Sequence, residues 1–232
     1  MKKSEITWTY LGLIPYETAI MLQIQLREEI LTSGRGDILL LMEHHPVFTL
    51  GCGAQPADII VSSPQLKGID VVRTDRGGLV TYHGPGQLVG YPILNLQKKR
   101  LGTREYVLQL SNVLIALLAD LGLVARWKDS HPGIWIEERK IASVGIHVHR
   151  HVSTHGFALN VSNDLSPFSL IVPCGIPECS MTSVEKERGK KLEPIDLADA
   201  FALHFGRIMM TDMSRIEAGP LLARSHFLSE QR

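Results

Sequence analysis

Excess charge, long apolar runs and paired cysteines are three features that this sequence of 232 residues lacks. Its 24 lysines and arginines match 24 aspartates and glutamates, whereas a nucleic-acid-binding protein normally carries a basic excess that displaces counterions from phosphates. The apolar run from Val113 to Leu118 is far shorter than the roughly 20 residues that span a bilayer. Polar residues follow Lys2 and Lys3, where a secretory signal would be apolar. We therefore expect a cytoplasmic protein that binds neither nucleic acid nor membrane.

The three cysteines, Cys52, Cys174 and Cys179, do not have the spacing of a disulfide framework or of a zinc site. An odd number of cysteines without an export signal argues against structural disulfides. Cys174 and Cys179 are five positions apart, whereas a zinc knuckle has two residues between its cysteines. We expect no metal site, which leaves a thiol available for chemistry.

Hydrophobic periodicity predicts strands and helices in an order typical of an α/β (α+β) protein. Ala19, Leu22, Leu26 and Ile30 recur at helical spacing and predict a helix over residues 15–32, ended by Gly34. Further helices are predicted over 103–122 with Thr103 as the cap, from the Thr182-x-x-Glu185 capping box, and between Pro194 and Gly206. Strands are predicted at 6–11, 38–42, 70–74, 79–82, 88–96, 124–127, 133–137, 141–152 and 156–161.

Several predicted strands follow one another without an intervening helix. This order favours a mixed or antiparallel sheet flanked by helices over a doubly wound parallel sheet. No repeat or low-complexity linker divides the chain. We expect one catalytic domain over residues 1–212 and a C-terminal tail of unknown role over 213–232.

A glycine-rich segment, RGGLVTYHGPGQ, occupies residues 76–87. Glycine permits positive φ and lets a ligand approach the backbone closely, and Arg76, Thr81, Tyr82 and His83 supply polar groups between the glycines. The segment is either a ligand-binding loop or a glycine-rich hairpin with polar tips. It is not a Walker loop, because no Gly-Lys-Ser/Thr follows at the required spacing, and it is not a dinucleotide fingerprint either.

A predicted turn over residues 137–139 places Lys140 at the head of a long strand. Alternation then puts His147, His149 and His151 on one face of that strand. These histidines are either metal ligands or a solvated face, and the absence of a neighbouring carboxylate or cysteine pattern favours the solvated face. Lys140 is by itself either a solvated cation or a catalytic amine.

Two shorter segments have small residues or a thiol in unusual settings. In HGFALN, Gly156 and Ala158 share one strand face and lack bulk, which predicts either a groove beside the sheet or close strand packing. In IVPCGI, Cys174 lies between a proline and a glycine, on a rigid bend where its sulfur can face a cleft. The alternative for this cysteine is a small buried hydrophobe.

These segments together resemble the octanoyl-[acyl carrier protein]:protein N-octanoyltransferase family of lipoate biosynthesis. The resemblance covers residues 39–187 in family order. The matching stretches are LLLMEHHPVFTLG, RGGLVTYHGPGQLVGYPILNL, PGIWIEERKIASVGIHV, HGFALNV and IVPCGIPECSMTSVEKE. It implies the mixed-sheet fold of the biotin and lipoate protein ligases, and an acyltransferase without a cofactor.

By the same resemblance, Cys174 is the acyl-accepting nucleophile and Lys140 is its partner. The substrate-binding residues implied are Arg76, Gly77, Gly78, Leu79, Val80, Thr81, Tyr82 and His83, with Ser143, Val144, Gly145, Gly156, Phe157 and Ala158 as walls of the acyl pocket. Cys52 departs from the family, which often has a basic residue after Leu-Gly, and this puts a peripheral contact in doubt. The implied donor is octanoyl-acyl carrier protein. The implied acceptors are the lipoyl domains of 2-oxoacid dehydrogenase acyltransferase subunits and the glycine cleavage H protein.

Three other functions remain open at this point. An ATP-dependent lipoate-protein ligase shares the fold but has no use for a cysteine, so Pro-Cys-Gly weighs against it. An octanoyl relay amidotransferase between lipoyl domains uses similar covalent chemistry with another donor, and the full glycine loop favours the carrier-protein enzyme. A non-catalytic carrier-binding module would make Cys174 and Lys140 incidental.

Overall fold

Two β-sheets form the framework of the protein, which is described from a computed structural model over residues 5–60, 68–172 and 180–223. The strands are β1 (Glu5–Ile14), β2 (Ile38–His44), β3 (Val47–Leu50), β4 (Asp70–Arg73), β5 (Val80–His83), β6 (Gln87–Ile93), β7 (Arg126–Trp127), β8 (Ile134–Ile136), β9 (Arg139–His149), β10 (Val152–Asn160) and β11 (Asp212–Arg215). The α-helices are α1 (Tyr16–Thr32), α2 (Thr103–Asp120), α3 (Val184–Arg188) and α4 (Ala198–Ile208). Short 3-10 turns are η1 (Pro56–Asp58), η3 (Ser166–Leu170) and η5 (Pro194–Leu197).

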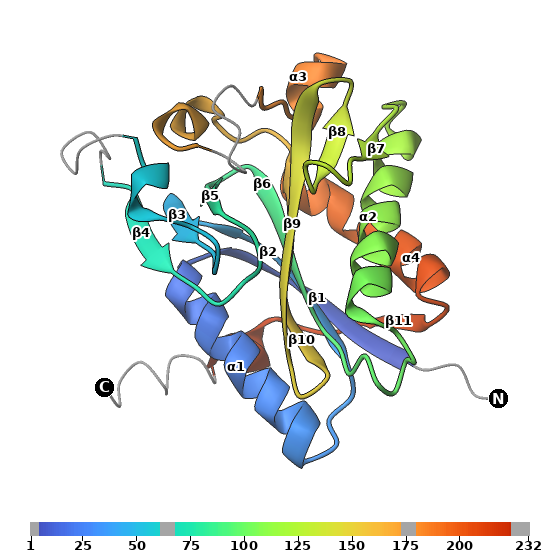
Figure 1. Cartoon of the computed structure of the whole chain (residues 1–232). Helices are drawn as coiled ribbons and strands as arrows, with labels where there is room; N and C mark the ends of the chain where they lie inside the picture. The colour runs from blue at the N-terminus through green and yellow to red at the C-terminus, as the bar shows by residue number, and fades with distance from the viewer. Residues whose placement is uncertain (1–4, 61–67, 173–179, 224–232) are drawn as a thin grey trace.

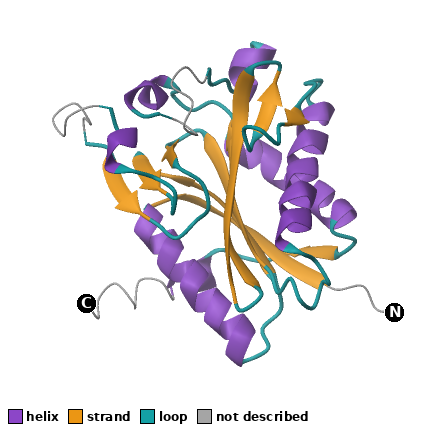
Figure 2. Cartoon of the chain, in the orientation of Figure 1, coloured by secondary structure: helices purple, strands orange, loops and turns teal. Residues whose placement is uncertain are grey.

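The larger sheet has eight strands in the order β11-β1-β2-β6-β10-β9-β8-β7, and the smaller has the order β4-β3-β5. In the larger sheet β1 runs parallel to β2 and β11, while the other pairings are antiparallel. Figures 1 and 2 show the long β9 and β10 crossing the middle of the molecule, with the small sheet beside α1. The predicted mixed sheet flanked by helices is confirmed.

Helices cover both faces of the larger sheet (Figure 1). On one face, α1 packs against β10 and β6 and buries Ala19, Leu22, Leu26 and Ile30, as the periodicity predicts. On the other face, α2 and α4 pack against each other and share a core with the strands. Because both faces are covered, the central β2 and β6 are buried along almost their whole length.

Three predicted helix boundaries differ from the structure by a few residues. Thr103 is the first residue of α2 rather than its cap, and Gly102 is the N-cap. Ser183, not Thr182, caps α3, because the Thr182 hydroxyl donates to Glu187 at 2.5 Å and Ser183 Oγ accepts from the Lys186 N–H. Gly206 lies inside α4 and does not end it.

The β9–β10 hairpin corrects the predicted strand over residues 141–152. The strand ends at His149, and Arg150 and His151 form the turn with φ of 47° and 70°. His151 therefore does not share a strand face with His147 and His149. Among the described residues no group of three or more histidines, cysteines, aspartates or glutamates is arranged to hold a metal ion.

Residues 213–223 continue the fold. β11 pairs in parallel with β1, so the predicted domain boundary at residue 212 falls inside a strand. Leu221 is buried in the core between α1 and the sheet. Within the described part of the chain, no helix is both long enough and apolar enough to cross a bilayer.

Truncation of a buried leucine on α2 tests this packing. Leu114 is fully buried, and Leu114→Ala should lower the free energy of unfolding by about 3 kcal/mol, because it removes buried methyl groups and leaves a cavity. Leu203 on α4 is 61% exposed, and Leu203→Ala should change it by less than about 0.5 kcal/mol. Urea unfolding measures both; equal effects would contradict the burial of α2.

Candidate functional site

A cavity of about 180 Å³ lies where the glycine-rich segment meets β9, β10 and β6. All the substrate-binding residues implied by the resemblance line it except Tyr82, and Lys140 lines it too. Tyr16, Tyr91, Pro132 and His155 complete the lining. The cavity wall thus combines segments that are far apart in the sequence.

Tyr82 faces away from this cavity. Side chains alternate along a strand, so Thr81 and His83 face the cavity while Tyr82 between them faces the opposite side. Its ring packs in the core beside the small sheet, 5.6 Å from the rings of both Phe48 and Phe168. The contribution of Tyr82 is to hold β5 in place.

The glycines bring the loop and the strands into close contact. The Gly77 N–H donates to the Ile146 carbonyl of β9 at 2.9 Å. A Cβ atom on Gly145 would lie 2.8 Å from the Gly77 oxygen, and one on Gly156 would lie 2.2 Å from the Gly90 oxygen of β6. The small residues therefore serve close backbone packing and at the same time line the cavity, which combines the two alternatives that the sequence left open.

Arg76 connects the loop to the small sheet. Its guanidinium donates to the hydroxyl of Thr49 from Nε at 3.1 Å and from Nη2 at 2.8 Å, and Nη2 also donates to the Thr49 carbonyl. Nη1 donates to the Gly77 carbonyl at 3.1 Å. With 8% of its surface exposed, Arg76 contributes to the cavity wall while its guanidinium fixes β3 against the loop.

Lys140 is buried at the cavity, with only 1% of its surface exposed. Its Nζ donates to the Pro132 carbonyl at 2.8 Å and lies 5.8 Å from the centre of the Trp135 ring. The lysine side chain runs over Gly133, where a Cβ atom would lie 2.3 Å from Cε. A buried amine needs polar partners, and a carbonyl and an aromatic ring supply them here at the cavity.

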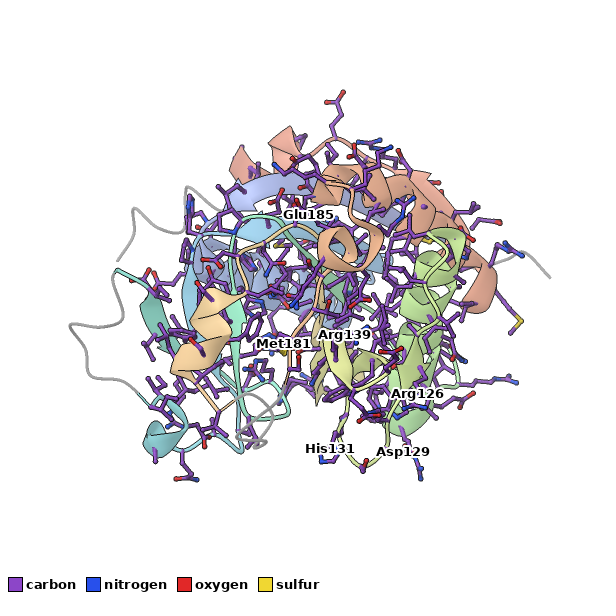
Figure 3. All side chains as sticks on the ribbon, turned by 90° about the horizontal axis from the view of Figure 1, so that it is seen from above. Arg126, Asp129, His131, Arg139, Met181 and Glu185 are labelled. Carbon is purple, nitrogen blue, oxygen red and sulfur yellow. The ribbon has the colours of Figure 1, made fainter. Side chains whose placement is uncertain are left out.

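The backbone of Lys140 pairs with residues 180–182. Its N–H donates to Ser180 at 2.8 Å and its carbonyl accepts from Thr182 at 2.9 Å, which makes a parallel bridge with Met181. Figure 3 shows Met181 and Arg139 near one another in the centre of the view from above. Cys174, the predicted nucleophile, lies in residues 173–179, outside the described residues.

Buried polar side chains link His83 at the cavity to this same bridge. Gln87 Nε2 donates to the Asn160 Oδ1 at 2.9 Å, so Gln87 Oε1 is the acceptor for His83 Nδ1 at 2.7 Å. Asn160 Nδ2 in turn donates to the Thr182 carbonyl at 3.0 Å. Gln87 and Asn160 are each 1% exposed. The chain of hydrogen bonds fixes the tautomer of His83 and holds residue 182 beside Lys140.

Behind His83, the side chains of Tyr16, His44 and Tyr91 form an aromatic cluster. The Tyr16 ring stacks on His83 with centroids 5.9 Å apart. His44 Nδ1 donates to the Ile14 carbonyl at 3.1 Å, and the Tyr91 hydroxyl donates to His44 Nε2 at 2.8 Å. Burial lowers the pKa of His44 to about 4 and lowers the pKa of His83 well below its ordinary value. Both rings are neutral at pH 7.

His155 and Asp75 form a hydrogen-bonded pair at another part of the wall. His155 Nε2 lies 2.7 Å from Asp75 Oδ1, and since a carboxylate only accepts, the imidazole donates. Burial lowers the pKa of His155, and the hydrogen bond from His155 lowers the pKa of Asp75 to about 2. At neutral pH the pair is a neutral imidazole and a carboxylate.

Residues 15–206 match the family model of the lipoyl protein ligase A/B catalytic domain. The chain belongs to this family. Relatives named octanoyltransferase include two from Myxococcus xanthus and Alkaliphilus metalliredigens. The one from Myxococcus xanthus is 42% identical over 93% of this chain and 62% of its own length. The one from Alkaliphilus metalliredigens is 46% identical over 77% of this chain and 84% of its own. The chain thus spans under two thirds of the Myxococcus protein.

Solved structures of the lipoyl protein ligase A/B family and of biotin ligases share the fold. A lipoate-protein ligase A bound with ATP superposes with a TM-score of 0.72 at 20% identity, covering 96% of this chain and 94% of that one. A biotin protein ligase from Aquifex aeolicus, in complex with biotin and ATP, has a TM-score of 0.53 at 15% identity, covering 89% and 70%. These likenesses show the fold alone.

Buried neutral histidines predict how the free energy of unfolding depends on pH. In the unfolded chain His44 titrates near 6.5, but in the fold only at about 4, so between these values the unfolded chain binds more protons and stability falls as the pH falls. His44 alone should contribute roughly 3 kcal/mol to this loss. Urea unfolding at pH 7 and at pH 4 measures it: the loss of stability between the two should be roughly 3 kcal/mol smaller in His44→Gln, while His83 and His155 keep their own share of the slope. Identical slopes in both proteins would contradict a buried neutral His44.

Proposed function

We propose that this protein transfers an octanoyl group from acyl carrier protein to a lysine of a lipoyl domain, through a thioester on Cys174. The observation that carries the proposal is the buried Lys140 side chain at a cavity walled mostly by glycine and apolar residues. The octanoyltransferase names of relatives at 40–46% identity support the same reaction. The proposed acceptors are lipoyl domains of 2-oxoacid dehydrogenase complexes and the glycine cleavage H protein, and the proposed compartment is the cytoplasm.

Chain connectivity supports a pairing of Cys174 with Lys140. Cys174 precedes Ser180 by six positions in the sequence, and the Ser180 carbonyl accepts a hydrogen bond from the Lys140 backbone. On the other side, Cys174 follows Val172 by two positions, and the Val172 N–H is bonded to Asp58 at 2.7 Å. Cys174 is therefore six residues or fewer from a backbone partner of Lys140, and the meeting of sulfur and amine is part of the proposal.

The first step exchanges one thioester for another. A free thiol titrates near ~8.5, and a nearby ammonium stabilises its thiolate. The Cys174 thiolate attacks the carbonyl carbon of the octanoyl thioester, a C–S bond forms, and the bond to the carrier sulfur breaks. Lys140 gives a proton to the leaving thiolate and becomes neutral, so charge and protons balance.

The second step forms an amide. The acceptor lysine amine attacks the acyl-enzyme carbonyl, and the bond to Cys174 breaks. Neutral Lys140 takes the proton that the amine loses, which restores the ammonium beside the thiolate. Conversion of a thioester to an amide is downhill, so the reaction needs neither ATP nor another cofactor.

The cavity wall contains small residues beside which a hydrocarbon chain can bind. Ser143, Gly145, Gly156 and Ala158 leave room beside β9 and β10, and buried methylenes gain about 0.8 kcal/mol each. A chain one methylene longer or shorter changes binding by only ~1–3 kcal/mol, so selection for eight carbons should be incomplete.

An ATP-dependent ligase is the principal alternative because the ATP-bound ligase shares the fold. The likeness to that ligase is at 20% identity and concerns the fold, whereas relatives at twice this identity are named octanoyltransferase. A Pro-Cys-Gly thiol suits thioester exchange, whereas adenylate formation has no use for a cysteine. We therefore favour the transferase.

Intact-mass measurement tests the proposed function. The protein is incubated with octanoyl-carrier protein without ATP, and a single octanoyl adduct is expected. The adduct should be absent in Cys174→Ser and should form about a hundredfold more slowly in Lys140→Ala, because the proton transfer is lost. Cys52→Ser, Cys179→Ser and the exposed Lys190→Ala are matched controls that should keep the wild-type rate.

Three outcomes would replace the proposal. Adduct formation only from ATP and free octanoate would identify a ligase. Adduct formation from an octanoylated lipoyl domain but not from the carrier would identify a relay amidotransferase. No adduct under any of these conditions would leave a carrier-binding module.

A further inference from the structure

One wall of the cavity, formed by Arg76 and Gly77, belongs to the segment of residues 74–77, which crosses from the small sheet to the large one. The Thr74 N–H donates to the Leu50 carbonyl of β3 at 2.9 Å, which fixes the start of the crossing. The Gly77 N–H donates to Ile146 of β9 at 2.9 Å, which fixes its end. Asp75 lies between these two anchors and is the one carboxylate in the crossing. The contacts of its carboxylate connect this segment to the large sheet.

The Asp75 carboxylate lies between two histidines of the large sheet. Oδ1 accepts from His155 Nε2 of β10 at 2.7 Å, and Oδ2 lies 3.7 Å from His147 Nε2 of β9. The His155 side chain is 4% exposed while that of Asp75 is 55% exposed, so a buried ring holds a carboxylate that reaches in from the surface. Thr74 Oγ1 lies 3.3 Å from the same His155 nitrogen.

The backbone of His155 is adapted to this contact. His155 has φ of 58° in the middle of β10, a conformation that is uncommon for a residue with a side chain. The Gln23 side chain on α1 stabilises it by accepting the His155 N–H at 2.6 Å. Left-handed residues inside a strand occur where the surrounding structure over-determines them, often at functional sites. Here the result is that the His155 ring lines the cavity and reaches Asp75.

We propose that Asp75 is a positioning residue, which through His155 holds the 74–77 wall against β9 and β10 and so shapes the cavity for the acyl chain. Asp75 contacts neither Lys140 nor the reacting carbonyl in this role. This inference rests on the proposed function for the identity of the chain, but the placement of the wall does not depend on it. The ligand class is a saturated acyl chain.

Steady-state kinetics with octanoyl-carrier protein test the role. Asp75→Ala should raise KM about tenfold, the effect of losing a hydrogen bond to a charged group, and leave kcat within about threefold, because the reacting groups are untouched. Asp75→Asn should restore KM to within about threefold of wild type, since its Oδ1 still accepts from His155. The exposed Asp70→Ala on the neighbouring β4 is the matched control and should resemble wild type.

A double-mutant cycle identifies the partner. His155→Asn removes the ring, while asparagine tolerates positive φ, so the backbone of β10 is kept. Combined with Asp75→Ala, it should raise KM no further than either single change. His149→Asn at the exposed end of β9 is the matched control. Additive effects, or a KM in Asp75→Ala equal to wild type, would overturn the proposal, as would a kcat loss without a KM change.

Amide hydrogen exchange separates this proposal from the proposed function. The Gly77 N–H is bonded to Ile146, and its protection factor should fall about tenfold in Asp75→Ala if the carboxylate holds the wall, as the loss of a hydrogen bond to a charged group predicts. Asp75→Asn should keep the protection. This measurement needs no substrate, so it decides the role of Asp75 even if no octanoyl adduct forms. Unchanged protection in Asp75→Ala would contradict the role.

Discussion

The burial of one lysine side chain is the constraint on which the rest of the site depends. Lys140 has 1% of its surface exposed, and a buried ammonium needs partners that offset its lost hydration. The Pro132 carbonyl and the Trp135 ring provide them from the segment before β8 and from β8 itself. Gly133 provides the space, since any side chain there would overlap the lysine. The β8–β9 hairpin therefore holds the Lys140 side chain beside the cavity.

The site also requires a second cavity wall in addition to the one that holds Lys140. The glycine-rich loop supplies it because backbone atoms of Gly77 and Gly145 approach more closely than side chains would permit. Arg76 and Asp75 fix the loop in different directions, the first toward β3 and the second toward β10. The His83–Gln87–Asn160 hydrogen bonds then tie the loop to the strand partner of Lys140. The wall and the cation are therefore positioned by one connected network.

Local pattern predicted the elements well, because periodicity records which face of an element is buried. The helix with Leu22 and Leu26 lies where the pattern placed it, whereas the strand that follows Lys140 ends at His149 and does not continue to residue 152. Caps differed by one residue where Thr182 bonds to Glu187, five positions on, because the Glu187 carboxylate also pairs with Arg139 of β9, a contact between distant segments that no local pattern reveals. Tyr16 was missed because its place in the cavity depends on how α1 packs against the sheets, a tertiary fact.

The central claim is that the Lys140 ammonium stabilises the Cys174 thiolate. The most direct measurement is the pH dependence of Cys174 alkylation by iodoacetamide, in a Cys52→Ser, Cys179→Ser background with and without Lys140→Met. With Lys140 present, we predict that the midpoint of the pH dependence of Cys174 alkylation lies below the ~8.5 of a free thiol. In Lys140→Met this midpoint should rise by a pH unit or more, about 1.4 kcal/mol. Equal midpoints in the two proteins would contradict it.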